Sequence, residues 1–206
     1  MWFVQTRIKK EPIGLIMRVS MKVDKGKIAV EAAIELFGDN GFDNTSTQSI
    51  AKHAGIGNAT LFKYFPTKDV LIKEAYLSTK METLRKIKQG LDPNASFESM
   101  LRTMWLNYID WALKFPQKHK FVLQVHHSRF DCPEIEEKIQ SEMLFFQLAL
   151  NSAKQNKLIM NEDNEVIYAL IMNFLNLAIE FQLKNSEISE IKFYQFMLRC
   201  LSIEKK

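Results

Sequence analysis

Residues 41–71 read GFDNTSTQSIAKHAGIGNATLFKYFPTKDVL and carry the strongest local structural signals in the chain. Thr45 is a candidate N-cap with Gln48 three residues later, a capping-box arrangement that predicts a short helix ending at Gly55. A second short helix is expected over 58–64, after the glycine-containing turn. Two short helices joined by such a turn predict a helix-turn-helix motif.

Longer helices are expected on both sides of this motif. Before it, apolar residues recur every three or four positions over 24–40, and a glycine follows where a helix C-cap usually lies. After it, Pro66 ends the second short helix and Thr67 can cap a long helix. We therefore expect residues 21–75 to form a three-helix domain, with the long helix leading out of it.

The remaining sequence predicts helices throughout, so the expected fold class is all-α with about nine helices. Only 7 glycines and 5 prolines interrupt the 206 residues, and apolar residues between them recur at helical spacing. The clearest linker is Gly90 to Ser96. A larger domain is expected over 76–206, with helices at 97–115, 117–128, 133–155, 163–185 and 189–202.

Composition excludes several classes of protein. The two cysteines, Cys132 and Cys200, are too few for a disulfide framework and lack metal-ligand spacing, which is typical of a reducing cytosol. No unbroken apolar run reaches the roughly 20 residues that a membrane span needs, and the first segment has no signal-peptide core. We expect a cytoplasmic protein with no metal site and no cofactor.

Residues 1–20 show no helical period and are expected to be an N-terminal extension. Met17 and Met21 offer later translation starts, so one interpretation is a misassigned start. The other interpretation is a basic arm that contacts phosphates, because this segment holds four basic residues and one acidic residue.

Net charge gives little support to any nucleic-acid argument. The whole chain carries +4, but residues 21–75 hold seven lysines against seven acidic residues. An argument for DNA binding therefore has to rest on where the charges lie.

Residues 41–56 and 61–71 together resemble the signature of the TetR family of bacterial regulators. The aromatic, threonine, Ile-Ala, Ala-Gly and Phe-x-x-Lys-x-x-Leu elements occur in the order and at the spacing of that family, over about fifty residues. The resemblance implies a dimeric transcriptional regulator that binds operator DNA and a small-molecule effector. Residues 91–206 carry no motif that we can match.

The motif offers groups that suit DNA. The hydroxyls of Thr45, Ser46 and Thr47 lie at a predicted helix N-terminus, which favours a phosphate oxygen. The second short helix can enter the major groove, where Asn58 suits an adenine edge and Thr60 a thymine methyl group. With positions that the resemblance adds, the expected DNA-contacting residues are Thr45, Thr47, Gln48, Asn58, Thr60, Phe62, Lys63, Tyr64 and Lys68.

Structural roles compete at some of these positions. Gln48 can serve only to complete the capping box, and Phe62 and Tyr64 can belong to the domain core. The chain also departs from the family pattern. Gly57 stands where a capping serine is frequent, Phe62 replaces a tyrosine and so lacks its hydroxyl, and Tyr64 replaces a frequent histidine.

The larger domain is rich in bulky apolar residues, most of which we expect in its core. The resemblance implies an effector cavity among its helices. His126 and His127 are adjacent, so on a helix they point about 100° apart and are not expected to share a metal. The residues expected to line the cavity are Trp105, Tyr108, Phe121, Phe145, Phe146 and Asn173.

The last two predicted helices, over 163–185 and 189–202, are apolar on several sides and need cover. Packing against the same pair from a second subunit would form a four-helix interface with two-fold symmetry. We therefore expect a homodimer that presents two recognition helices to a pseudo-palindromic, double-stranded operator.

The sequence favours no enzyme, because it has no glycine-rich phosphate loop, no metal-ligand cluster and no nucleophile beside a plausible base. The predicted function is a repressor that an effector releases from its operator by displacing the long helix. The alternative that stays open is a helical interaction module that does not bind DNA.

Overall fold

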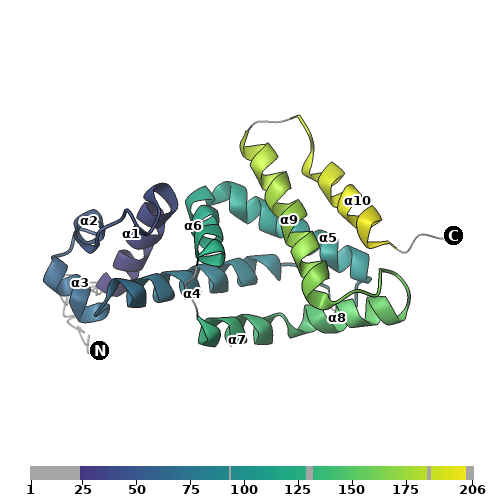
Figure 1. Cartoon of the computed structure of the whole chain (residues 1–206), viewed down its shortest axis with the longest axis horizontal. Helices are drawn as coiled ribbons and strands as arrows, with labels where there is room; N and C mark the ends of the chain where they lie inside the picture. Colours follow the sequence, from purple (N-terminus) through teal and green to yellow (C-terminus); the bar gives the residue numbers. More distant parts are fainter. Residues whose placement is uncertain (1–23, 93, 129–131, 185–186, 203–206) are drawn as a thin grey trace, which may run out of the picture.

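The structure is a computed structural model that describes residues 24–92, 94–128, 132–184 and 187–202. Within these residues the chain forms ten α-helices and no strand, which confirms the all-α prediction (Figure 1). The extension predicted over 1–20 lies outside the described residues. The helices are α1 (Lys25–Asn40), α2 (Thr47–His53), α3 (Asn58–Tyr64), α4 (Lys68–Ile87), α5 (Phe97–Lys114), α6 (Pro116–His127), α7 (Pro133–Glu142), α8 (Leu144–Gln155), α9 (Asn164–Leu183) and α10 (Glu190–Leu201).

Helices α1 to α3 gather at one end of an elongated molecule, and we call them the head (Figure 1). Asp24 caps α1 by accepting from the Gly26 backbone N–H at 3.1 Å. The head core is formed by fully buried side chains that include Phe37, Ile50 and Leu61, one from each helix. Because these side chains meet at the centre, the opposite faces of α2 and α3 are left toward solvent.

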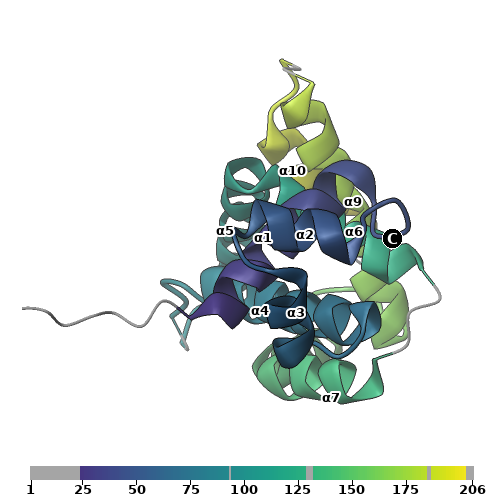
Figure 2. The ribbon, with the colours of Figure 1, turned by 90° about the vertical axis from the view of Figure 1, so that its left-hand side faces the viewer.

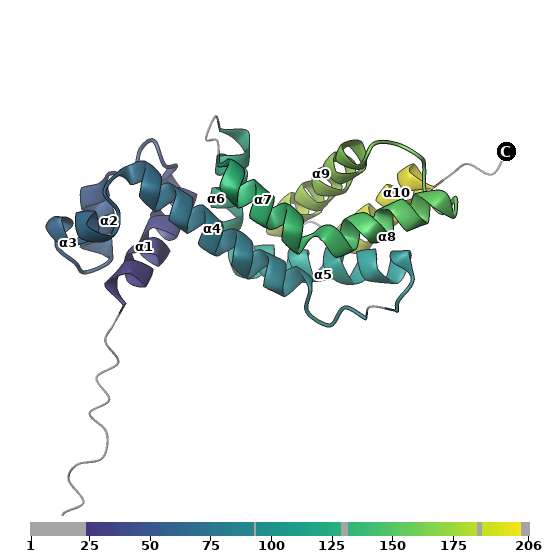
Figure 3. The same cartoon turned by 90° about the horizontal axis from the view of Figure 1, so that it is seen from below.

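Helix α4 connects the head to the remaining helices, α5 to α10, which we call the body (Figure 3). Thr67 caps it by accepting from the Val70 backbone N–H at 3.2 Å. Twenty helical residues at about 1.5 Å each give a rod of roughly 30 Å. Its first half buries Leu71 and Ala75 on the head side, and its second half buries Leu84 in the body.

A second contact, between α1 and α6, joins the head to the body. Gly38 permits it, because a Cβ atom at this position would lie 2.3 Å from the Gln117 carbonyl oxygen. Next to this contact the rings of Phe37 and Phe121 stack with centroids 5.5 Å apart. The predicted domain boundary at residue 75 therefore stays a prediction, because α4 continues through this position without a break and α6 packs against α1 of the head.

The single helix expected over 133–155 is wrong, because the chain forms α7 and α8 with a break at Met143. Met143 has φ −100° and ψ 5°, and its N–H donates to the carbonyls of Ile139 and Gln140. The break lets α7 pack against α4 while α8 packs against α5. Neither glycine nor proline occurs at this position, which is why the sequence pattern predicted one continuous helix there.

Helix α9 packs between α5 and α10 and buries Ile167, Ile171 and Leu175. Among the residues that the structure describes, α9 alone is long and apolar enough to cross a membrane by length and composition. Polar residues, including Asn173 and Asn176, interrupt its apolar run. Only 28% of this apolar stretch is buried, so α9 leaves an apolar face uncovered beside its contacts with α5 and α10.

Candidate nucleic-acid interface and effector cavity

Helix α3 lies on the outer surface of the head beside α2 (Figure 2). Buried Leu61 anchors it, whereas Asn58 and Lys63 are exposed and Thr60 is half-buried. The turn before it contains Gly55 with φ +65°, a left-handed conformation that glycine adopts without strain. The turn and the Leu61 anchor therefore present the polar face of α3 to solvent.

The N-terminus of α2 is capped by Ser46 and not by Thr45, so that prediction is wrong. The Ser46 hydroxyl accepts from the Ser49 N–H at 3.0 Å. Thr45 is only 3% exposed, and its hydroxyl donates to the Gly41 carbonyl at 2.7 Å. Because this bond closes the loop between α1 and α2, Thr45 is turned away from the surface and cannot reach a phosphate.

The capping-box role of Gln48 is also wrong, because Ser46 and Ser49 satisfy the first turn of α2. Gln48 is exposed, and within the described ranges no side-chain hydrogen bond holds its amide. Thr47, beside it, is half-buried. The structure thus leaves the Gln48 amide available to a partner, in keeping with the other interpretation of this residue.

The two aromatic residues of α3 are both partly exposed. Phe62 is 40% exposed and Tyr64 is 48% exposed. Tyr64 also packs on α1, because a Cβ atom on Gly26 would lie 3.0 Å from the Tyr64 Cδ1 atom. Neither ring belongs fully to the core, so both are partly accessible on the surface of α3.

Acidic and basic residues are unevenly distributed along the head and the start of α4, which the net charge does not show. Residues 44–68 contain Lys52, Lys63 and Lys68 and no aspartate or glutamate. Lys68 is the half-buried first residue of α4. The acidic residues of the head precede this segment, and one of them, Glu35, accepts from His53 at 2.8 Å. The surface of α2 and α3 is therefore cationic. Counting charged residues over short windows of the sequence would have revealed this.

A cavity of about 200 Å³ lies in the body between α4, α5, α7, α8 and α9. Three of the six predicted lining residues, Trp105, Tyr108 and Phe146, are in its wall. The wall also contains residues that were not predicted from the sequence, notably Lys80, Met143 and Tyr168. No local pattern could have selected them, because the cavity forms only when five helices pack together.

The other three predicted lining residues lie elsewhere, which corrects that expectation. Phe121 is fully buried against Phe37 at the contact between head and body. The Phe145 ring lies 5.4 Å from the Lys88 ammonium. Asn173 is exposed, and its amide donates to the Ala169 carbonyl at 2.7 Å.

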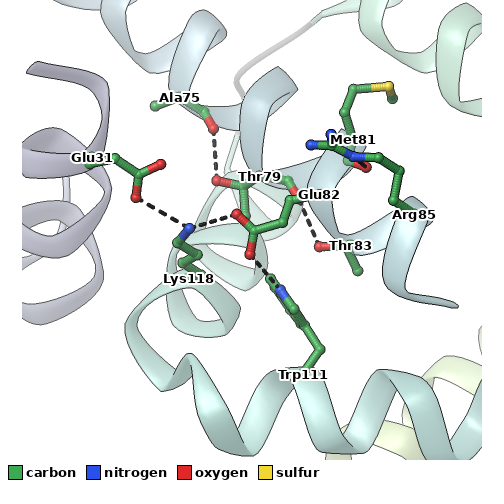
Figure 4. A network of polar contacts seen from close by, with 9 residues as sticks. All are labelled: Glu31, Ala75, Thr79, Met81, Glu82, Thr83, Arg85, Trp111 and Lys118. Atoms are coloured by element: carbon green, nitrogen blue, oxygen red, sulfur yellow. Dashed lines mark hydrogen bonds and ion pairs between the residues drawn. The ribbon is translucent and has the colours of Figure 1, made fainter. Parts of the chain in front are cut away.

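An ion-pair network ties the head to the body beside α4 (Figure 4). The Lys118 ammonium of α6 lies 2.6 Å from Glu82 of α4 and 3.2 Å from Glu31 of α1. Trp111 of α5 donates its indole N–H to Glu82 at 3.0 Å. Burial alone would lower the pKa of Lys118, but the hydrogen bond to Glu82 and the charge of Glu31 raise it overall. The network therefore stays charged and joins four helices.

Comparison with known proteins adds a family match. Residues 29–75 match the family described as bacterial regulatory proteins, tetR family. The HTH-type transcriptional regulator YhgD of Bacillus subtilis is uncharacterized and 26% identical over 106 residues, which are 51% of this chain and 53% of that protein. An HTH-type transcriptional regulator of Staphylococcus aureus (strain MRSA252) is 32% identical over 52% of this chain and 56% of its own length. The chain spans about half the length of these curated relatives.

Solved structures match along most of the chain. A TetR family transcription regulator from Marinobacter aquaeolei VT8 aligns with a TM-score of 0.78 at 21% identity. The alignment covers 86% of this chain and 95% of that one. At this identity the likeness establishes the fold, from the head through the body.

Proposed function

Because the chain belongs to the TetR family of bacterial regulatory proteins through residues 29–75 and its fold, we propose that it is a DNA-binding transcriptional regulator of the bacterial cytoplasm. One observation carries the proposal. The polar face of α3 is exposed within residues 44–68, a segment that runs from the head to the first residue of α4 and holds three lysines and no acidic residue. Such a surface suits the phosphate backbone of a duplex.

In the proposed complex, α3 enters the major groove. Asn58 has the amide geometry that pairs with an adenine edge, and exposed Lys63 suits a guanine or a phosphate. Gln48 and Phe62 extend this face, while Thr47 and Lys68 border it at the starts of α2 and α4. Thr60 and Tyr64 complete the proposed set, and Thr45 is left out because it is buried.

We propose that two copies pair through α9 and α10. Both helices present large apolar side chains to solvent, and Val166 and Phe196 are 51% and 52% exposed. Covering these faces with the same faces of a second copy would give a four-helix interface. It would also present two α3 helices to a pseudo-palindrome, whose half-sites lie about 34 to 36 Å apart. The exposed apolar residues of this pair include Val166, Leu177, Leu183, Ile191 and Phe196.

The proposed control of DNA binding runs through α4. The C-terminal half of this helix supplies Lys80, Thr83, Leu84 and Ile87 to the cavity wall, and its N-terminal half packs on α1. An effector that fills the cavity would displace α4 and change the separation of the two heads. Release of the operator needs a coupling of only about 1 to 3 kcal/mol. The protein would then act as a ligand-released repressor.

Selection of fragments from a random DNA pool, followed by anisotropy titrations at several salt concentrations, tests the proposal. We expect an enriched pseudo-palindrome and a binding constant that falls steeply with salt. Asn58→Ala should weaken binding about tenfold or more and relax the preference at one base pair. Asn94→Ala is the matched control, since Asn94 is exposed in the linker between α4 and α5. Failure to enrich any sequence would favour the interaction module instead.

A further inference from the structure

The body cavity has a mostly apolar wall with a few polar groups in it. Its volume of about 200 Å³ exceeds the roughly 150 Å³ that is enough for an apolar cavity to take up benzene. The apolar part comes from all five surrounding helices. It includes Leu84, Leu101, Met104, Ile139, Phe146 and Leu175.

Lys80 is the cation in this wall. Its ammonium makes no hydrogen bond or ion pair with any residue that the structure describes, and it lies 5.8 Å from the Tyr76 ring centroid. Burial lowers the pKa of Lys80, and the charge of Glu136 only partly opposes this effect. Glu136 is exposed on α7, outside the cavity wall, where its carboxylate accepts from the Tyr76 hydroxyl at 3.4 Å. Among the described residues, Lys80 therefore has no ion-pair partner, and Glu136 acts on it only at longer range.

Two further donors in the wall are also without partners. The Trp105 indole N–H and the Tyr168 hydroxyl are buried, and neither has a hydrogen-bond partner in the described part of the chain. Buried polar groups are normally paired, because an unpaired one loses its hydration without compensation. The other hydroxyl groups of the wall are occupied. Thr83 donates to the Thr79 carbonyl at 2.8 Å, and the Tyr108 hydroxyl lies 3.4 Å from His119 Nδ1.

We propose that this cavity binds a small amphipathic monocarboxylate, whose carboxylate pairs with Lys80 while its apolar part lies among the aliphatic side chains. Trp105 and Tyr168 then donate to oxygen atoms of the same ligand. An ammonium and an indole N–H can only donate, so the wall selects an anionic acceptor over a cation. The binding site stands independently of DNA, and its role as the effector site rests on the proposed function.

Isothermal titration of the full-length protein without DNA tests the ligand class. The probes are sodium octanoate, 1-octanol and octylamine, which share a chain length and differ in the charge of the head group. We expect octanoate to bind on the order of tenfold more tightly than either other probe. Lys80→Met should abolish this preference. Lys86→Met removes a cation from the same helix outside the cavity wall and should leave the preference unchanged.

Tyr168→Phe separates a binding role from a structural one. Because the hydroxyl has no hydrogen-bond partner among the described residues, its removal should not lower the melting temperature, yet it should weaken octanoate binding severalfold. Equal binding of the three probes, no octanoate binding, or unchanged octanoate affinity in Lys80→Met would overturn the inference. Octanoate binding by a protein that enriches no DNA sequence would refute the proposed function and leave the inference standing.

Discussion

Replacing Gly38 by alanine adds a methyl group where α1 approaches α6. The added Cβ atom would lie 2.3 Å from the Gln117 carbonyl oxygen and 2.8 Å from its carbonyl carbon. Both are backbone atoms, so no side chain can rotate away. Ordinary contacts begin near 3.4 Å, and the two helices must therefore separate by about 1 Å. Overpacking of this kind costs about 1 to 3 kcal/mol.

For a chain of this size, each kcal/mol lowers the melting temperature by about 2 to 4 °C, so we expect Gly38→Ala to melt about 2 to 12 °C below the parent protein. Circular dichroism at 222 nm measures the transition. Gly57→Ala is the control, because its Cβ atom would meet only the Thr60 hydroxyl at 3.8 Å. If Gly38→Ala melts no lower than Gly57→Ala, the close approach of α1 to α6 is not as described.

Three further predictions concern the polar network, pH and the assembly. Lys118→Met leaves Glu82 and Glu31 without their cation, and urea unfolding should show a loss of about 1 to 2 kcal/mol, a figure reduced for the partial exposure of Glu82. Burial lowers the pKa of His119 to about 4, so the unfolded chain binds the extra proton first as pH falls below about 6.5. The folded state should therefore lose roughly 2 kcal/mol between pH 7 and pH 5, and urea titrations at the two pH values should show a smaller loss in His119→Asn. Phe196→Asp places a charge on the exposed apolar face of α10, and light scattering should detect a shift from dimer toward monomer, whereas an unchanged dimer would place the interface elsewhere.

The local parts of the fold could be predicted because their signals are short in range. The second short helix of the motif, expected over 58–64, is found as Asn58–Tyr64, and α4 begins after its expected cap, Thr67. Helical hydrogen bonds join residues four apart, so caps, glycines and prolines act within one turn. This short range also explains the wrong prediction of the α2 N-cap. Thr45 and Ser46 are adjacent hydroxyl residues, and local sequence alone does not distinguish which of them caps the helix. The Thr45 hydroxyl also donates to the Leu36 carbonyl at 3.2 Å, nine residues back on α1, and this longer-range contact leaves Ser46 as the cap.

By itself the sequence determined an all-helical chain, the position of the helix-turn-helix motif and the residues on the polar face of α3. Tertiary structure alone decided that α1 meets α6 at Gly38, that the chain breaks at Met143, and that Lys80 lines a cavity without an ion pair to any described residue. The reason is physical. A helix forms from contacts within one turn of the chain. A cavity or a helix crossing depends on side chains from distant segments, and the local hydrophobic pattern does not show which segments pack together.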